Sequence, residues 1–221
     1  MKTIKDFFKS LGIIIIYVVL ITATELLNEG MFNSYGLIIK NIVLTLGTFI
    51  TALIIAYLLK EKLKGQFDDF KKNYKKYIPF ALKTWLIGLC VMVISNLIIT
   101  FLAGGIAPNE EANRELIKNY PFYSITSVCL LAPFTEELLF RLNFKNIIKS
   151  RLPFILFTGV FFGFVHILAS EHLIELLYII PYSALGIAFA KTYYDTNNIY
   201  SSVFAHAFHN TLTILVILGS L

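Results

Sequence analysis

The sequence predicts an all-α fold: a polytopic integral membrane helix bundle of about seven transmembrane helices, with its N-terminus in the cytoplasm. Three observations predict it. Of the 221 residues, 57% are hydrophobic and only 15% are charged, and the mean hydropathy is +0.73. The hydrophobic residues gather in segments near the ~20 residues that a helix needs to cross ~30 Å of hydrocarbon. Most charged residues lie between these segments.

Seven apolar segments follow one another with no soluble domain, repeat or low-complexity tract between them, so residues 1–221 are predicted to form a single membrane domain. The first segment follows three lysines and imitates a secretory signal. It has no small-residue cleavage site with a soluble domain behind it, so we interpret it as an uncleaved first span. The segments cover residues 11–28, 36–59, 78–103, 121–149, 152–170, 173–194 and 199–219.

Basic residues gather before the first segment and in every second connection, which places the N-terminus in the cytoplasm and the C-terminus outside. The second connection holds most of them: Lys60, Lys62, Lys64, Lys71, Lys72, Lys75 and Lys76. Within it, residues 66–77 form either a basic helix along the inner membrane surface or a solvated loop attracted to anionic lipid. The net charge of +5 therefore indicates membrane orientation, and no nucleic acid partner is expected.

The fourth segment carries ionisable side chains, each of which costs ~2.5–3.5 kcal/mol to place inside a membrane. Glu137 and Arg141 are spaced i, i+4 on one helix face, so they are expected to form an ion pair that supports the structure. Glu136 points about 100° away from Glu137 around the helix. It is therefore the carboxylate predicted to be available for chemistry.

Later segments bring imidazoles and an amide into the membrane. If the fourth helix continues to about Ser150 and Pro153 opens the fifth, Glu136 and His166 both lie roughly 20 Å from the turn. Gly159 and Gly163 let the helix backbone approach a neighbour closely, for which the fourth helix is the candidate. In the seventh segment, Ser202, His206 and Asn210 share one face. His172 and His209 are interpreted as bystanders.

Three motifs result: Glu136-Glu137-x-x-x-Arg141, Phe162-x-x-x-His166 and His206-x-x-x-Asn210. In this order on successive membrane helices, they resemble the type II CAAX prenyl endopeptidases, also called the CPBP or ABI family of intramembrane proteases. The resemblance covers residues 121–219, which are therefore expected to be the catalytic core.

The resemblance implies an intramembrane endopeptidase that hydrolyses peptide bonds. Glu136 would act as general base on a water with help from His166, and His206 and Asn210 would donate hydrogen bonds to the oxyanion. The cofactor stays open. Glu136, His166 and His206 are acceptable zinc ligands, as in a metalloprotease, but no hydrogen-bond acceptor that would orient the histidines is readable, which slightly favours a metal-free mechanism.

Two other functions stay open. The same resemblance reaches non-catalytic membrane immunity or regulatory proteins, and Glu/His/Arg clusters also serve proton-coupled transporters, although no inverted repeat is found. Other protease motifs, namely His-Glu-x-x-His, Gly-x-Ser-x-Gly and a pair of membrane aspartates, do not occur. The expected partners are the lipid bilayer and a peptide or membrane-protein substrate. The compact, lysine-rich and phenylalanine-rich chain indicates a bacterial cell membrane.

Overall fold

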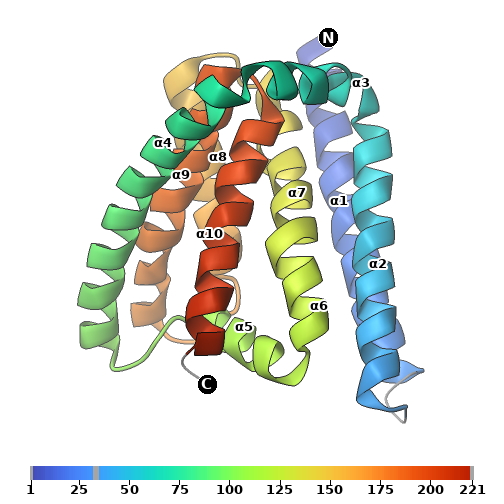
Figure 1. Ribbon diagram of the computed structural model, residues 1–221, viewed down its shortest axis with the longest axis vertical. Coiled ribbons are helices and arrows are strands. Elements are labelled where there is room, and N and C mark those ends of the chain that lie inside the picture. The colour runs from blue at the N-terminus through green and yellow to red at the C-terminus, as the bar shows by residue number, and fades with distance from the viewer. Residues whose placement is uncertain (1, 32–34, 220–221) are drawn as a thin grey trace. The chain divides into compact units, whose positions relative to one another are not determined.

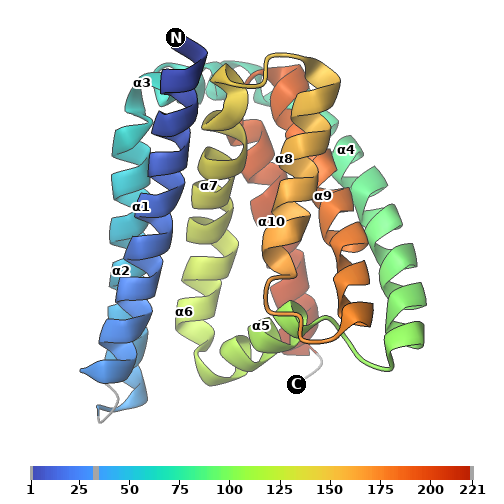
Figure 2. The same cartoon turned by 180° about the vertical axis from the view of Figure 1, so that it is seen from behind.

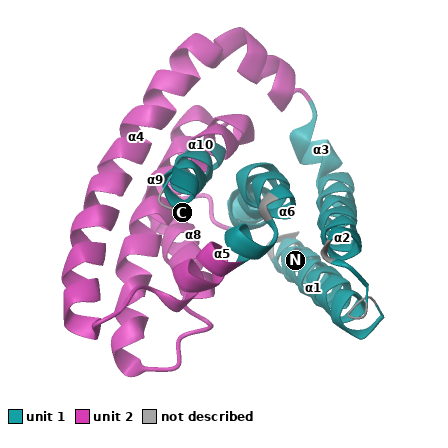
Figure 3. Ribbon diagram, turned by 60° about the horizontal axis from the view of Figure 1, so that its bottom comes forward, with its two compact units in different colours: residues 1–64, 116–147, 207–221 teal, residues 65–115, 148–206 magenta. Residues whose placement is uncertain are grey.

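The computed structural model describes residues 2–31 and 35–219, and over these residues its regular structure is entirely helical (Figure 1). This confirms the predicted all-α membrane bundle. The chain forms two compact units, which Figure 3 shows in different colours. The first unit contains residues 1–64, 116–147 and 207–221, and the second contains residues 65–115 and 148–206.

In the first unit, two long apolar helices run side by side: α1 (Lys2–Gly30) and α2 (Leu37–Leu58) (Figures 1 and 2). Gly47 permits this approach, because a Cβ atom added there would lie within 3 Å of the side chain of Thr24. The short helix α3 (Lys60–Leu63) follows α2. Helix α2 matches the second predicted span, residues 36–59, to within one residue at each end. Helix α1 ends two residues after the first predicted span, residues 11–28, but starts nine residues before it.

The sequence predicted one continuous helix for the fourth span, but the structure divides it into several short segments. Its segments are α6 (Pro121–Thr126), the π-helical turn η1 (Ser127–Leu131), α7 (Ala132–Glu137), the π-helical turn η2 (Leu138–Leu142) and the 3₁₀ turn η3 (Phe144–Asn146). The helical run therefore ends before Ser150, the expected end. A π turn inserts an extra residue into an α-helix, so the two turns change which faces the side chains occupy.

In the second unit, α4 (Gln66–Ala103) is one helix of 38 residues, about 57 Å long. In Figure 1, its first turns run across the top of the view, and the rest of the helix runs downward on the left. Pro79 lies inside the helix, and an interior proline removes a backbone hydrogen bond and bends the axis. Residues 66–77 are thus helical. The predicted alternative of a solvated loop over these residues is therefore wrong.

The helix α8 (Arg151–His166) packs against α9 (Ile179–Thr196), which follows the 3₁₀ turn η4 (Leu173–Tyr178). A Cβ atom added to Gly163 would lie 2.8 Å from the backbone nitrogen of Ser183, and one added to Gly159 would lie 2.7 Å from that of Ile187. The glycines therefore do allow a close approach. Their neighbour is α9, however, and not the fourth predicted span.

The start of α10 (Ile199–Gly219) is fixed by hydrogen bonds to the first turn of α4. The amide of the fully buried Asn198 donates to the carbonyl of Gln66 at 2.7 Å and to Asp69 Oδ2 at 2.8 Å. The backbone N–H of Ile199 donates to Gln66 Oε1 at 2.7 Å. The last of these bonds satisfies an N–H group that a helix start otherwise leaves without a helical acceptor. Together the three bonds position the start of the helix that carries His206.

Five helical stretches in the described residues are long and apolar enough to cross a membrane: Ile4–Gly30, Ile38–Leu58, Lys60–Ala103, Leu173–Thr196 and Ile199–Gly219. The other two predicted spans differ for separate reasons. Residues 121–149 are divided into short turns, and the fifth span has only the 16 residues of α8 instead of the predicted 152–170. The membrane bundle is thus confirmed, while the described part of the chain has five such stretches and not the seven predicted spans.

Candidate active site

The ion pair expected from the spacing of Glu137 and Arg141 is present. Arg141 Nη1 lies 3.3 Å from Glu137 Oε1, and both side chains are completely buried. The guanidinium also lies over the ring of Phe140, 5.7 Å from its centre. A buried charge is tolerated only when it is paired, so these two residues neutralise each other inside the first unit.

Glu136 occupies a different position from its neighbour. It lies in α7, a six-residue α-helical segment between the π-helical turns η1 and η2. Its side chain is partly exposed. Single π-helical turns inside α-helices occur frequently at functional sites. Of the two adjacent carboxylates, Glu137 is therefore fully buried with a cation, whereas Glu136 is only partly buried, with its Oε2 atom inside the protein.

The end of this helical run is held by side chains from α1 and α3. Lys62 Nζ donates to the carbonyls of Leu142 and Asn143, each at 3.1 Å. Asn143 Nδ2 donates to the carbonyl of Ser10 at 3.0 Å, and Ser10 Oγ donates back to the carbonyl of Asn143 at 3.1 Å. These bonds satisfy the last carbonyls of a helix. The segment that carries Glu136 is consequently fixed at its carboxyl end.

Asn210 is bonded to the amino end of the same segment. Its Nδ2 donates to the carbonyl of Val128 in η1 at 2.8 Å. That carbonyl lacks its usual helical donor: the N–H of Ala132 bonds to Ser127, and the next residue, Pro133, has no N–H. Asn210 thus replaces a backbone hydrogen bond that a proline removes. The amide has a second N–H, so this bond is compatible with a further role.

We expect Asn210→Ala to lower the free energy of unfolding by about 1–3 kcal/mol, because a partly buried carbonyl loses its donor. Pro133→Ala supplies a backbone N–H at the position that would reach Val128. In the Pro133→Ala background, Asn210→Ala is therefore expected to lower the free energy of unfolding much less than it does in the wild type. Unfolding of the purified variants in mild detergent measures both losses. Equal losses from Asn210→Ala in both backgrounds would contradict this account.

In the second unit, His166 is the last residue of α8 and is half-buried. Its Nδ1 lies 2.8 Å from the carbonyl oxygen of Phe162, one turn earlier. A carbonyl can only accept, so Nδ1 carries the hydrogen and the neutral ring presents its lone pair at Nε2. The ring also lies against Phe162 and Tyr182, with centres 4.2 and 5.0 Å apart. Its orientation is therefore well defined.

His206 is almost completely buried in the same unit. Its ring stacks on Phe189 of α9, with centres 4.6 Å apart and planes at 17°. The edge of Phe162 approaches it at 5.5 Å. Phe162 thus contacts both His166 and His206, which brings the two predicted imidazoles to one aromatic side chain.

The predicted residues divide between the units. Glu136, Glu137, Arg141 and Asn210 lie in the first, and His166 and His206 lie in the second. The meeting of Glu136 with the imidazoles stays a prediction, and so does zinc: within neither unit do three or more described His, Cys, Asp or Glu side chains form a group that fits a metal ion. Of the interpreted bystanders, His172 is exposed and His209 is half-buried.

Sequence reasoning missed two supporting residues, Phe189 and Lys62, and it missed the backbone acceptor of His166, the carbonyl of Phe162. Nothing in the sequence indicates that Phe189 stacks on His206 or that Lys62 binds the end of η2. The acceptor of His166 was readable, because it belongs to the residue one helical turn earlier. That acceptor removes part of the argument against zinc, since a metal-binding histidine usually donates its other ring N–H to such a group.

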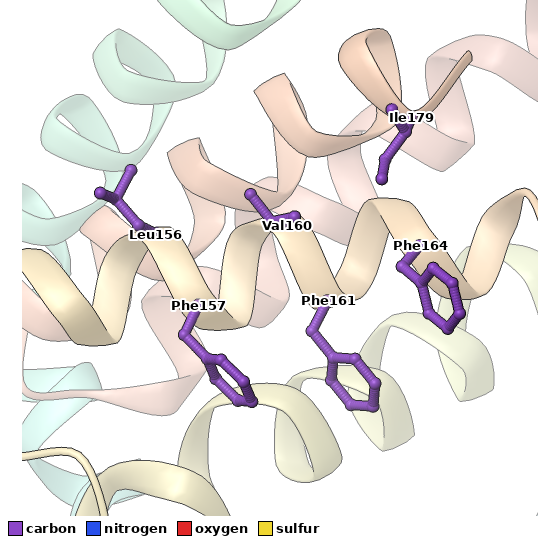
Figure 4. A pocket seen from close by; sticks show the side chains of 6 residues that line it. All are labelled: Leu156, Phe157, Val160, Phe161, Phe164 and Ile179. Atoms are coloured by element: carbon purple, nitrogen blue, oxygen red, sulfur yellow. The ribbon is translucent and has the colours of Figure 1, made fainter. Parts of the chain in front are cut away.

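An open apolar hollow of about 460 Å³ lies along α8 (Figure 4). Leu156 and Val160 line it on the side of Ile179, and three phenylalanines project from α8 on its other side. It is lined by Leu156, Phe157, Val160, Phe161, Phe164 and Ile179. None of these residues is polar, so the hollow suits hydrocarbon and is separate from the candidate site residues.

Comparisons with known proteins agree with the motifs. Residues 118–212 match the family model described as "Type II CAAX prenyl endopeptidase Rce1-like". The matched region contains all the candidate site residues, from Glu136 to Asn210. No solved structure matches the chain.

Two bacterial relatives match most of the chain. It is 27% identical over 200 residues to the "Putative membrane peptidase YdiL" of Bacillus subtilis, which covers 86% of this chain and 75% of that protein. It is 25% identical over 208 residues to an uncharacterized protein of Mycoplasma capricolum, which covers 88% of this chain but only 59% of that protein. With the five apolar helices, these relatives indicate an integral membrane protein of bacterial type.

Proposed function

We propose that Glu136 activates a water molecule to hydrolyse a peptide bond within the membrane. The match of residues 118–212 to the model of Rce1-like type II CAAX prenyl endopeptidases supports this proposal. The substrate is a peptide or a membrane protein. One observation carries the choice of Glu136 over Glu137: Glu137 is fully buried against Arg141 at 3.3 Å, whereas Glu136 is partly exposed.

The reaction uses proton transfer in both directions. The Glu136 carboxylate accepts a proton from water as the water oxygen attacks the scissile carbonyl carbon. The same proton then passes to the leaving amine as the carbon–nitrogen bond breaks. His166 assists by accepting a hydrogen bond from the water at Nε2, a role that its Nδ1 bond to Phe162 supports. No covalent bond between the enzyme and the substrate is required.

The tetrahedral intermediate carries negative charge on the former carbonyl oxygen. Hydrogen-bond donors that are already in place stabilise this charge most effectively. We assign that role to His206, whose ring is held by Phe189 and Phe162, and to the second N–H of Asn210. An amide suits this role because it donates without titrating.

A bound zinc ion is the alternative way to activate the water. Glu136, His166 and His206 would hold it, and it would supply Lewis acidity to the water and the carbonyl. The proposal of a metal-free mechanism predicts that protein washed with a chelator keeps its activity with substoichiometric zinc. Stoichiometric zinc, whose removal abolishes activity and whose return restores it, would overturn that mechanism while leaving the hydrolase assignment intact.

The role of His206 has a matched control on the same helix, because His209 lies three residues later on a different face. We expect His206→Ala to lower kcat by about 10²–10³-fold, the usual cost of losing an oxyanion donor. His209→Ala is expected to retain activity within a few fold. Cleavage of a membrane peptide library by the reconstituted proteins, read by mass spectrometry, makes the comparison. Equal activity of the two variants would remove His206 from the mechanism.

A further inference from the structure

The first three turns of α4, residues 66–77, present different residue types on three faces. We call this segment the surface helix. One face carries residues that bond inward: Gln66 to the start of α10, and Asp69 to Asn73 Nδ2 at 2.8 Å, Tyr77 Oη at 2.9 Å and Asn198. Tyr77 is buried. The segment is therefore docked on the start of α10 through this face, and also through Phe67, whose ring centre lies 5.2 Å from that of Tyr200.

The opposite face is basic and open. Four lysines share the sector of the helix opposite Gln66 and Tyr77, as the period of 100° per residue shows. They are Lys71, Lys72, Lys75 and Lys76. All four side chains are exposed. Asp68 is the one acidic residue on this sector, and its ion pair with Lys71, at 3.3 Å between exposed groups, is worth little. The sector thus has a net charge of +3.

Between the docked and the basic faces lie two aromatic side chains, Phe67 and Tyr74. They are 52% and 45% exposed, so about half of each ring stays uncovered, although one side of Phe67 packs against Tyr200. Lys71 Nζ lies 4.6 Å from the centre of the Phe67 ring. Aromatic rings flanked by lysines are typical of helices that lie in the interface between lipid headgroups and acyl chains.

We propose that the surface helix binds the headgroups of anionic phospholipids through Lys71, Lys72, Lys75 and Lys76, with Phe67 and Tyr74 in the interface beside them. Charge complementarity selects this partner, because the cytoplasmic leaflet is anionic and attracts lysine clusters next to a membrane span. The apolar part of α4 begins directly after this segment, which holds the lysines at headgroup level. The proposal is independent of peptide hydrolysis.

The test uses the full chain, delipidated in a neutral detergent and titrated with phosphatidylglycerol or phosphatidylcholine, with bound lipid counted by native mass spectrometry. The wild type is expected to prefer phosphatidylglycerol. Each lysine near the surface contributes about fivefold to affinity, so replacing all four with glutamine is expected to weaken phosphatidylglycerol binding at least tenfold and leave phosphatidylcholine binding unchanged. Replacing all four with arginine is expected to retain binding.

A matched control removes the same charge elsewhere by replacing four other exposed lysines with glutamine, and it is expected to weaken binding clearly less than the four-lysine variant of the surface helix. These lysines are Lys5, Lys9, Lys60 and Lys64. Equal losses in both glutamine variants, or no preference for phosphatidylglycerol in the wild type, would overturn the proposal. Displacement of the lipid by an acidic peptide at equal concentration would assign the face to a protein partner, and displacement by inorganic phosphate would assign it to the free ion. The arginine variant separates charge loss from misfolding.

Discussion

Glu136→Gln is expected to lower the rate of peptide hydrolysis by about 10²–10⁴-fold while the protein accumulates normally in the membrane. Glutamine has nearly the same shape but cannot accept a proton, so the water is no longer activated, and a general base contributes that much to the rate. Because Glu136 is partly exposed and is not the carboxylate bound to Arg141, the substitution leaves the fully buried ion pair intact. Single-turnover cleavage in reconstituted vesicles measures the effect.

The control is Glu111→Gln, which removes an exposed carboxylate from α5 (Pro108–Asn119) and is expected to leave the rate unchanged. Full hydrolysis by the Glu136→Gln protein would reject Glu136 as the base. A cellular phenotype that survives Glu136→Gln, with no cleavage in either protein, would instead favour a non-catalytic immunity or regulatory role. The membrane and secreted peptides of cells carrying each form identify the substrate.

Arg141→Met is expected to destabilise the protein by about 3–5 kcal/mol, because it leaves the carboxylate of Glu137 buried without its cation. The double variant Glu137→Met/Arg141→Met removes both charges and is expected to recover most of that loss, since well-packed apolar residues often replace a buried ion pair at no cost. Unfolding in mild detergent, followed for the single and double variants, gives the coupling energy between the two residues.

The chain contains a second arginine–glutamate pair at the same spacing, which serves as the control. Arg114 Nη2 lies 2.7 Å from Glu110 Oε1, but this pair is exposed. Arg114→Met is expected to cost less than about 1 kcal/mol. Similar losses for Arg141→Met and Arg114→Met would show that burial does not govern the strength of the inner pair.

The sequence predicted those features that depend on residue type and regular spacing. The apolar segments gave the membrane bundle, and the i, i+4 rule gave the ion pair of Glu137 with Arg141. It did not predict the two π-helical turns, because spacing arguments assume one helical period throughout. Pro133, inside the expected span, was the available signal. The bond of Asn210 to Val128 was not predictable, since a backbone carbonyl carries no residue-type signature.

The length of α8 limited the sequence prediction in another way. Apolar residues continue past His166 to Leu168 and Ala169, so composition extended the expected span to residue 170. The helix ends at His166 because the next residues form turns. Hydropathy measures the preference for lipid, and it does not record where backbone hydrogen bonding stops.

The 16 residues of α8 rise by only about 24 Å, several ångströms less than the hydrocarbon thickness of an average bilayer. Such hydrophobic mismatch is relieved when the surrounding bilayer thins or when flanking polar groups admit solvent. Relative to the predicted span of residues 152–170, the missing residues lie at the end that carries His166. We therefore expect water to reach this imidazole more readily than it would in a full-length span.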